Sequence, residues 1–309
     1  MKTTHFPNGV CCGGTSVPRS GLSGYSPGTL YSLKDASLGQ APSWVNIGTY
    51  ASCLFVPYGP VMGYGFATAG GPVTSAGGDV TEVITLGPGN VADGDIAILG
   101  METTNDTDQV DAVVLATGGT LTLTANADPG TAHSYVFGLL RDNCVPTWDI
   151  VAAGTRVALD ADDATIEITA ADVLATDIAF ASIIDTDDSD LVCGVVPGAG
   201  TVTITASADP VVDHTFGYMV LRPRGSFKPS HYVAYAGTHT TAADVGAPHF
   251  NSISVPGALA TDIPIVCWGS AGAGADIIEA VCSADALQVS FAADPTVNQV
   301  VNYMILRAY

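Results

Sequence analysis

The sequence predicts an all-β protein: an extended N-terminal arm followed by three tandem small antiparallel β-sandwich or barrel repeats of about 80 residues each. Helix formers with long charged side chains are scarce, since Glu occurs four times and Lys three times among 309 residues. Thr, Val, Ile, Gly and Asp abound instead, and short runs alternate polar with apolar residues, as in strands with one buried face. Landmarks that recur three times predict the tandem arrangement.

The threefold repetition is visible in residues at near-constant spacing. An Asp-Pro pair occurs three times, and an Arg follows each Asp after thirteen residues. These landmarks are Asp128, Asp209 and Asp294 with Arg141, Arg222 and Arg307. An Asp-Ile pair and an Ala-Gly pair also recur upstream, as Asp95-Ile96, Asp177-Ile178, Asp262-Ile263, Ala69-Gly70, Ala153-Gly154 and Ala236-Gly237. The chain is therefore predicted to contain three copies of one unit.

Each unit carries the same succession of strand signals. The first strand is expected at 81–86, 165–169 and 251–255, the second at 96–99, 178–183 and 263–268, the third at 113–115, 191–195 and 277–281, and the fourth at 120–124, 201–205 and 287–291. The fifth is the apolar run into each Arg, and a further strand accompanies each Ala-Gly pair. Asp-Pro and Gly mark the turns. This density of short strands is typical of a small sandwich or barrel.

The landmarks set the expected boundaries of the three units at 67–141, 150–222 and 232–309. The linkers 142–149 and 223–231 hold Pro, Gly and polar residues, which permit neighbouring units to pack in several arrangements. The units are expected either in a string or in a cluster, and a pseudo-threefold cluster within one chain is among the possibilities.

The first 66 residues lie outside the repeat. Residues 1–44 are rich in Gly, Ser, Pro and Thr and show no sustained periodicity, so they are not expected to bury enough apolar area to fold alone. They nevertheless contain aromatic residues, and the chain becomes apolar from Trp44 onward. We expect an extended arm that becomes ordered by lying on another surface; the alternative is that it packs on the first repeat.

The charge excludes several classes of partner. The chain has 30 Asp and Glu against 9 Lys and Arg, a formal net charge of −21. A nucleic-acid binder needs a basic face for phosphates, and attachment to anionic lipid needs basic residues. No apolar run approaches 18 residues, and the start lacks the apolar segment of a signal peptide, so no membrane attachment is expected. Dense surface Asp suits either a saline habitat or simple solubility.

The sequence contains no recognisable catalytic or metal-binding motif. The seven cysteines form no CxxC pair, and Cys193, Cys267 and Cys282 lie in expected strands as core thiols. His133 and His214 occupy the same unit position, eight residues before the Arg, which indicates a polar loop position. The motifs of Ser hydrolases, zinc proteases and nucleotide-binding proteins are missing. We expect no enzymatic activity, no cofactor and no metal.

The recurring acidic and basic residues have a structural interpretation. The acidic loops 105–111 and 185–190 offer oxygen ligands for Ca²⁺ but lack the Gly and Glu of an EF-hand, so solvated turns are favoured. The Asp of each Asp-Pro pair is expected to accept backbone hydrogen bonds in its turn. Each recurring Arg ends a core strand and is expected to pair with an Asp or to cover the base of its sandwich.

Two segments resemble known virus proteins. The opening THFPNGV resembles the N-terminal signature of the decoration or cement proteins of tailed-phage heads. The run VTEVITL, followed by DIAIL, LTLTANADP and YVFGLLR, resembles β-domains in structural proteins of marine bacteriophages. The tandem triplication departs from that pattern and leaves the oligomeric arrangement open.

The resemblance implies a capsid decoration protein without catalysis. Its partner would be the major capsid protein, and its place the outer capsid surface of a virion assembled in the host cytoplasm. The arm would lie on the shell and order on binding. The residues expected to make this contact are His5, Phe6, Pro7, Asn8, Tyr25, Tyr31 and Trp44. A homo-oligomer is expected, with a trimer favoured.

Other functions remain open at this stage. A receptor- or glycan-binding head fibre or adhesin would show exposed aromatic residues, for which Trp148 and Tyr232 in the linkers are candidates. The capsid shell protein itself would need long helices. An enzyme acting on polysaccharide would need a unique pair of carboxylates in a cleft, which a repeated plan does not favour.

Overall fold

The structure of the chain is a computed structural model. It describes residues 12–14, 21–34, 36, 41–58, 63–74, 81–86, 90–92, 94–103, 110–116, 119–125, 134–158, 164–185, 192–206, 214–225, 229–241, 249–269, 277–291, 293 and 298–309. These residues form strands, turns and bends, and none of them is helical. The predicted all-β class is confirmed.

Three sets of six strands follow one another along the chain, and we call them units 1, 2 and 3. Unit 1 comprises β5 (Tyr64–Thr74), β6 (Thr81–Thr85), β7 (Ile96–Thr103), β8 (Val110–Ala116), β9 (Thr120–Ala125) and β10 (Ser134–Asp142). Unit 2 comprises β11 (Trp148–Ala158), β12 (Thr165–Thr169), β13 (Ile178–Asp185), β14 (Val192–Gly198), β15 (Thr201–Ala206) and β16 (His214–Pro223). Unit 3 comprises β17 (His231–Thr240), β18 (Phe250–Ser254), β19 (Ile263–Trp268), β20 (Ile277–Ser283), β21 (Ala286–Phe291) and β22 (Val300–Ala308).

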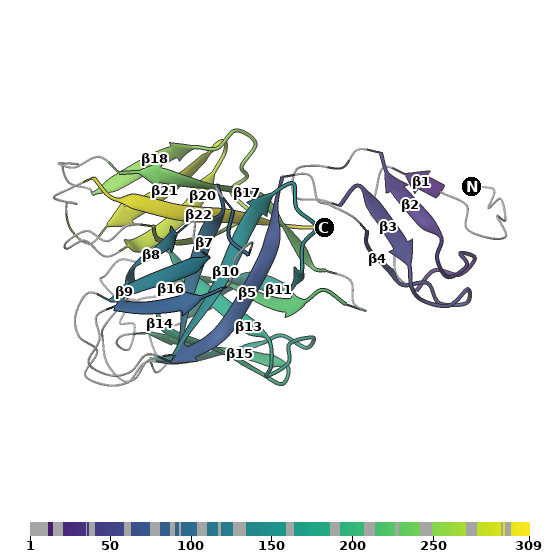
Figure 1. The fold of residues 1–309 in the computed structure, drawn as a ribbon, viewed down its shortest axis with the longest axis horizontal. Coiled ribbons are helices and arrows are strands. Elements are labelled where there is room, and N and C mark those ends of the chain that lie inside the picture. The colour runs from purple at the N-terminus through teal and green to yellow at the C-terminus, as the bar shows by residue number, and fades with distance from the viewer. Residues whose placement is uncertain are drawn as a thin grey trace.

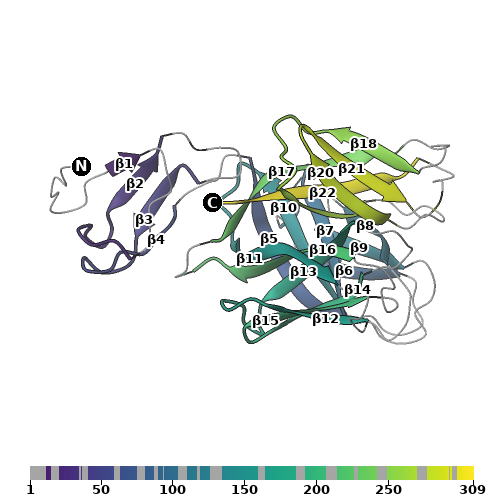
Figure 2. The same cartoon turned by 180° about the vertical axis from the view of Figure 1, so that it is seen from behind.

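Each unit folds into two facing antiparallel sheets with the same strand order. The inner sheets are β5-β10-β7, β11-β16-β13 and β17-β22-β19, and the outer sheets are β6-β9-β8, β12-β15-β14 and β18-β21-β20. Apolar side chains fill the space between them; in unit 2 these include Ile166, Ile204 and Phe216. Seen from behind, the outer sheets of units 2 and 3 lie on opposite sides of the body (Figure 2).

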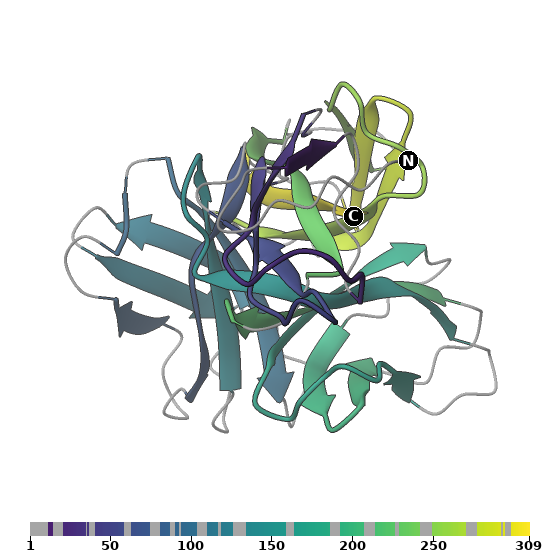
Figure 3. The ribbon, with the colours of Figure 1, turned by 90° about the vertical axis from the view of Figure 1, so that its right-hand side faces the viewer.

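The three sandwiches surround a common centre, as the end-on view in Figure 3 shows. The first strands meet there, because β5 pairs with β11, β11 pairs with β17, and β17 contacts β5. Each unit also lays one strand of its outer sheet against the inner sheet of another unit: β14 of unit 2 contacts β7 of unit 1, β20 of unit 3 contacts β13 of unit 2, and β8 of unit 1 contacts β19 of unit 3. The contacts form a closed cycle, and the body therefore has a pseudo-threefold axis.

An apolar core on this axis is shared by all three units. Leu140, Leu221 and Leu306 occupy equivalent positions in the last strands, and none of them is exposed to solvent. The inner sheets are thus buried on both faces, between their own outer sheet and the axis, as are sheets covered on both sides in other folds. In unit 1 the position equivalent to Met219 and Met304 is occupied by a glycine, Gly138. The ring of Phe66 fills the space that the missing side chain leaves.

Polar contacts between units also lie near the axis. The Ser182 hydroxyl of unit 2 donates a hydrogen bond of 2.9 Å to the carbonyl of Pro264 in unit 3. Asn302 of unit 3 donates one of 2.8 Å to the carbonyl of Ala97 in unit 1. The Cys267 thiol lies 3.6 Å from the same carbonyl oxygen. Because these groups are removed from solvent, each contact satisfies a polar group that would otherwise be costly to bury.

The first four strands, which lie between residues 12 and 57, form a small sheet beside the body (Figure 1), which we call the N-terminal sheet. Its strands are β1 (Cys12–Gly14), β2 (Leu30–Leu33), β3 (Ser43–Asn46) and β4 (Phe55–Pro57), in that order. Trp44 and Phe55 are fully buried in a core that also includes Ala41 and Cys53. The extended arm predicted for residues 1–66 is therefore wrong over 21–58, because aromatic residues scattered along this stretch gather into a core of their own.

One aromatic side chain joins the N-terminal sheet to the body. The ring of Tyr309, directly after β22, lies 5.3 Å from the ring of Trp44 and 5.1 Å from that of Tyr232. Its backbone N–H donates to the carbonyl of Ser230. The end of the body at which β10, β16 and β22 finish thus faces the N-terminal sheet, and we call it the proximal end.

A shared core predicts that the three units unfold together. Phe180→Ala removes a fully buried ring on the axis, and we expect it to lower the free energy of unfolding by about 3–5 kcal/mol. Calorimetry should show one transition for the body, shifted as a whole, whereas Thr169→Ala on an exposed outer face should leave it in place. A transition for unit 2 alone, with units 1 and 3 unchanged, would contradict a common core.

Candidate functional site

A three-part polar cluster closes the proximal end of each sandwich. In unit 2 the Arg222 guanidinium donates to Asp177 through Nε at 2.7 Å and a terminal nitrogen at 2.6 Å. The same terminal nitrogen donates to the backbone carbonyl of Asp172, and the Asp177 carboxylate accepts the backbone N–H of Leu174 at 2.8 Å. This cluster, which we call the clasp, ties the end of the sixth strand to the start of the third and to the turn before it.

The clasp recurs in units 1 and 3. Arg141 binds Asp95 through two bonds of 2.8 Å, and Arg307 binds Asp262 through bonds of 2.8 and 2.6 Å. The side chains of Asp95, Asp177 and Asp262 are each 1% exposed. Bidentate charge-assisted bonds of this kind are among the stronger hydrogen bonds in proteins. The hydrogen bond to the carboxylate raises the pKa of each Arg.

The clasp brings together two landmarks of the sequence, the recurring Arg and the Asp of the Asp-Ile pair. The Asp residues of the Asp-Pro pairs, Asp128, Asp209 and Asp294, lie outside the described residues. One further pair has no counterpart in the repeat: Arg224 donates two bonds, of 2.9 and 2.7 Å, to Asp149. This pair fastens the second linker to the start of β11 and was not foreseen, because a single Arg in a linker leaves no periodic signal.

The residues expected to contact a capsid have different environments. His5, Phe6, Pro7 and Asn8 lie outside the described residues. Trp44 was expected to lie on the shell, but it is fully buried and its indole N–H donates to the carbonyl of Ala41 at 3.0 Å. Trp44 is thus a core residue of the N-terminal sheet, and its assignment as a contact residue is corrected.

Tyr25 and Tyr31 are half-buried against the same core. Their rings lie 5.4 and 5.9 Å from the ring of Phe55, in edge-to-face arrangements that are favourable for aromatic pairs. Asn46 fixes the neighbouring segments: its side chain donates to the carbonyls of Tyr25 and Ser26 and accepts backbone N–H groups from the 48–54 turn. The sequence offered no signal for this role of Asn46.

Exposed apolar side chains are frequent on the N-terminal sheet. Tyr58 is 57% exposed, and Leu22, Ile47 and Tyr50 are each more than 40% exposed. Backbone hydrogen bonds from Gly24 to Tyr50 and from Cys53 to Leu22 hold the 21–24 segment beside the 47–54 turn. Lys34 and Asp35 are the charged residues of the whole stretch 21–58. The N-terminal sheet therefore presents an almost uncharged, partly apolar surface on a protein whose net charge is −21.

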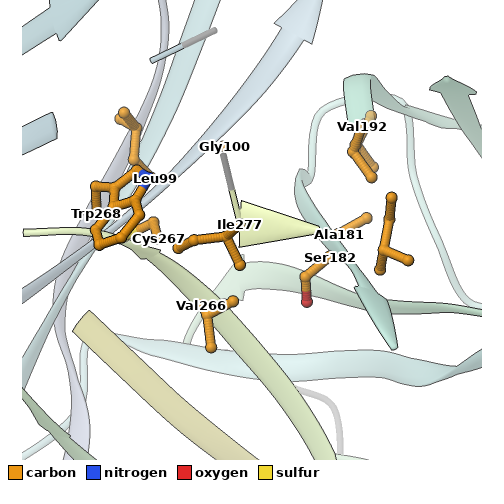
Figure 4. Close-up of a pocket in the computed structure, with 11 residues that line it drawn as sticks. Leu99, Gly100, Ala181, Ser182, Val192, Val266, Cys267, Trp268 and Ile277 are labelled. Atoms are coloured by element: carbon orange, nitrogen blue, oxygen red, sulfur yellow. The ribbon is translucent and has the colours of Figure 1, made fainter. Parts of the chain in front are cut away.

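A partly open pocket of about 130 Å³ lies where the three units meet. Figure 4 shows Leu99, Trp268, Cys267 and Ile277 on one side of it and Ala181, Ser182 and Val192 on the other. The lining residues come from β7 of unit 1, β13 and β14 of unit 2, and β19 and β20 of unit 3. No repeat alone could form this pocket.

Cys53, Cys144, Cys267 and Cys282 are free thiols, and Cys53 and Cys282 are buried. Burial raises the pKa of Cys267 to about 12, and burial together with the nearby Asp262 raises that of Cys282 to about 12. Such thiols are protonated at neutral pH and are poor nucleophiles. The side chain of Cys193 lies outside the described part of the chain, as does that of His214; His133 and most of the acidic loops 105–111 and 185–190 lie there too.

Within the described ranges, no group of three or more His, Cys, Asp or Glu residues is placed to hold a metal ion. The same ranges contain no helix that is long and apolar enough to span a membrane. The chain matches no protein-family profile, no curated protein sequence and no solved structure.

The clasp predicts a large cost for removing one partner. Arg222→Met leaves the buried carboxylate of Asp177 unpaired, and we expect a loss of about 3 kcal/mol in unfolding free energy. This loss is near the lower end of the range for breaking a buried ion pair, because the Arg222 side chain is 20% exposed. Denaturant unfolding measures the loss, with the exposed Glu167→Gln as control. Arg222→Met combined with Asp177→Asn, which removes the buried charge and keeps an oxygen for the Leu174 N–H, should recover most of the loss; equal losses in the single and double variants would contradict this account.

A second prediction concerns acid. Burial lowers the pKa of His231 below its ordinary value of 6.5. As pH falls through 6.5, the unfolded chain binds a proton before the folded one, so this histidine's contribution to stability is present above pH 6.5 and is lost below it. His231→Gln should therefore flatten the fall in Tm between pH 7 and 5, whereas Thr238→Gln, at an exposed position of the same strand, should not. An unchanged slope in His231→Gln would contradict the assignment.

Proposed function

We propose that the protein is a non-enzymatic structural protein of a virion that binds the outer surface of a phage capsid and stabilises it. Its partner is the major capsid protein. The observation that carries the proposal is the contrast between the uncharged, partly apolar N-terminal sheet and the strongly acidic chain to which it belongs. The resemblance of the opening residues to phage decoration proteins supports the same function.

The N-terminal sheet has the properties of a docking module. Leu22, Ile47 and Tyr50 are exposed on segments that backbone hydrogen bonds hold side by side, and exposed apolar side chains gathered in this way mark sites where another surface is bound. Tyr58 and Tyr50 are exposed aromatic residues, and aromatic side chains are enriched at protein interfaces. Because the remainder of the chain is acidic, its self-repulsion keeps copies apart in solution and leaves the uncharged sheet as the favoured contact.

The body supplies bulk and stability rather than chemistry. Its three equivalent clasps and its shared core serve to hold three sandwiches together, and equivalent polar clusters used three times have an architectural role. Binding to the assembled shell, and not to free subunits, stabilises the shell by mass action. The predicted homotrimer stays a prediction; a single chain already provides three units about an axis, so one copy for each binding position is our preferred arrangement.

A receptor- or glycan-binding head fibre is the alternative. The sequence pointed to Trp148 and Tyr232 as aromatic residues that a glycan could contact. Trp148 is half-buried, and Tyr232 is 6% exposed and packs against Tyr309. This environment removes one of the two residues that favoured the alternative.

Binding to capsids tests the proposal. Purified protein mixed with undecorated phage-like capsids should co-sediment at a fixed stoichiometry. Leu22→Asp combined with Tyr58→Asp places charge on the N-terminal sheet and should weaken binding at least tenfold. The matched control is Val83→Asp combined with Phe250→Asp, two exposed apolar residues on the outer sheets of units 1 and 3, which should bind as the unchanged protein does.

Three results would contradict the proposal. These are no co-sedimentation of the unchanged protein, equal binding by both double variants, or saturable binding to a glycan array without capsid binding. The last result would favour the head-fibre alternative.

A further inference from the structure

We propose that Tyr309 is a latch that holds the N-terminal sheet on the body in one fixed orientation, and that loss of this ring releases the sheet in its folded state. Three aromatic rings form the latch: Trp44 of the N-terminal sheet, Tyr309 at the end of unit 3, and Tyr232 at the start of unit 3. The latch would make a rigid assembly of two parts that are otherwise joined by the chain.

The position of Tyr309 has an equivalent in each unit. Two residues beyond the clasp arginines lie Asn143, Arg224 and Tyr309. The backbone N–H of each donates a hydrogen bond to a carbonyl at the start of the first strand of its unit. The acceptors, which are equivalent too, are the carbonyls of Gly63, Thr147 and Ser230. The backbone is therefore held in the same way three times, and the side chain decides what each position does.

In units 1 and 2 this side chain is bound within its own unit. The side chain of Asn143 donates to Asp142 at 3.0 Å, and its oxygen accepts the backbone N–H of Gly63 at 3.4 Å. Arg224 donates two hydrogen bonds, of 2.9 and 2.7 Å, to Asp149. Neither side chain offers an aromatic surface to the N-terminal sheet.

Unit 3 has an aromatic pair in place of these polar contacts. Tyr232 and Asp149 are equivalent, since each lies four residues before the Ala-Gly pair of its unit. The ring of Tyr309 lies 5.1 Å from that of Tyr232 and 5.3 Å from that of Trp44, which it meets edge to face at 80°. Edge-to-face pairs are favourable and directional. Burial raises the pKa of the Tyr309 hydroxyl, and the nearby Asp149 raises it further. The ring thus lies between the sheet and the body.

The N-terminal sheet has its own contacts to stay folded when the latch is open. Trp44 and Phe55 are buried in its core, and the indole N–H of Trp44 donates to Ala41 within the sheet. The buried Asn46 side chain joins the segments around this core. Among the described residues of the body, Tyr309 is the one that packs against the core. Modules with a small mutual contact are expected to move relative to each other unless a specific interaction prevents it.

The consequence for binding rests on the proposed function. A sheet bound to a capsid, with the latch closed, fixes the direction in which the acidic body projects from the shell. Ordering the body in the free protein removes that entropic cost from the binding step. The latch itself is a property of the free protein, and it is tested without capsids.

Residual dipolar couplings of the backbone amides test the latch on the full chain in solution. In the unchanged protein, the N-terminal sheet and the body should fit one alignment tensor. Tyr309→Ala should require two tensors, with smaller couplings for the sheet, while the amide shifts around Phe55 show that the sheet is still folded. Tyr309→Phe keeps the ring and should restore the single tensor.

Two further variants complete the test. Tyr232→Ala weakens the latch from the body side without a change in the core of the sheet, so it should also require two tensors. Tyr50→Ala removes an exposed ring of the sheet outside the latch and should keep one tensor. The proposal is overturned by two tensors in the unchanged protein, or by one shared tensor in Tyr232→Ala and in folded Tyr309→Ala. Neither result bears on capsid binding, so the proposed function stands or fails separately.

Discussion

The shared apolar core on the pseudo-threefold axis is the constraint on which the remaining structure depends. Each inner sheet carries apolar side chains on both faces, as the last strands with Leu140, Leu221 and Leu306 show, and one sandwich covers only one of these faces. The second face is covered when three units come together. The closed cycle of contacts between outer and inner sheets follows from this need, and the linkers are long enough to permit it.

Equivalent positions on the axis do not hold equivalent residues, and the differences give each unit a separate role. Phe66 compensates for Gly138 in the core, whereas Phe180 and Val136 pack against Gly100. The three clasps are nearly identical because each one ties the sixth strand of its unit to the start of the third strand. A single chain can thus keep three stable sandwiches and still present one N-terminal sheet, at the end where Tyr309 packs on Trp44.

The sequence predicts the strands well and their assembly poorly, for physical reasons. Alternation along β12 and β15 shows one buried face directly, and both strands lie where the pattern places them. The apolar run into Arg222 signals burial on both faces, but it does not show what covers the second face. The sequence predicted that an Asp pairs with this Arg, but it did not show which one, because Asp177 is 45 residues away along the chain. The arm prediction failed over 21–58 because its core is built from isolated aromatic residues that follow no period.

Hydrogen exchange of the backbone amides tests the shared core most directly. If one core holds the three units, the slowest amides of β10, β16 and β22 exchange only through global unfolding, and their opening free energies are equal and equal to that of the whole body. Three different limiting free energies, one for each unit, would contradict the account and would show three sandwiches that fold independently.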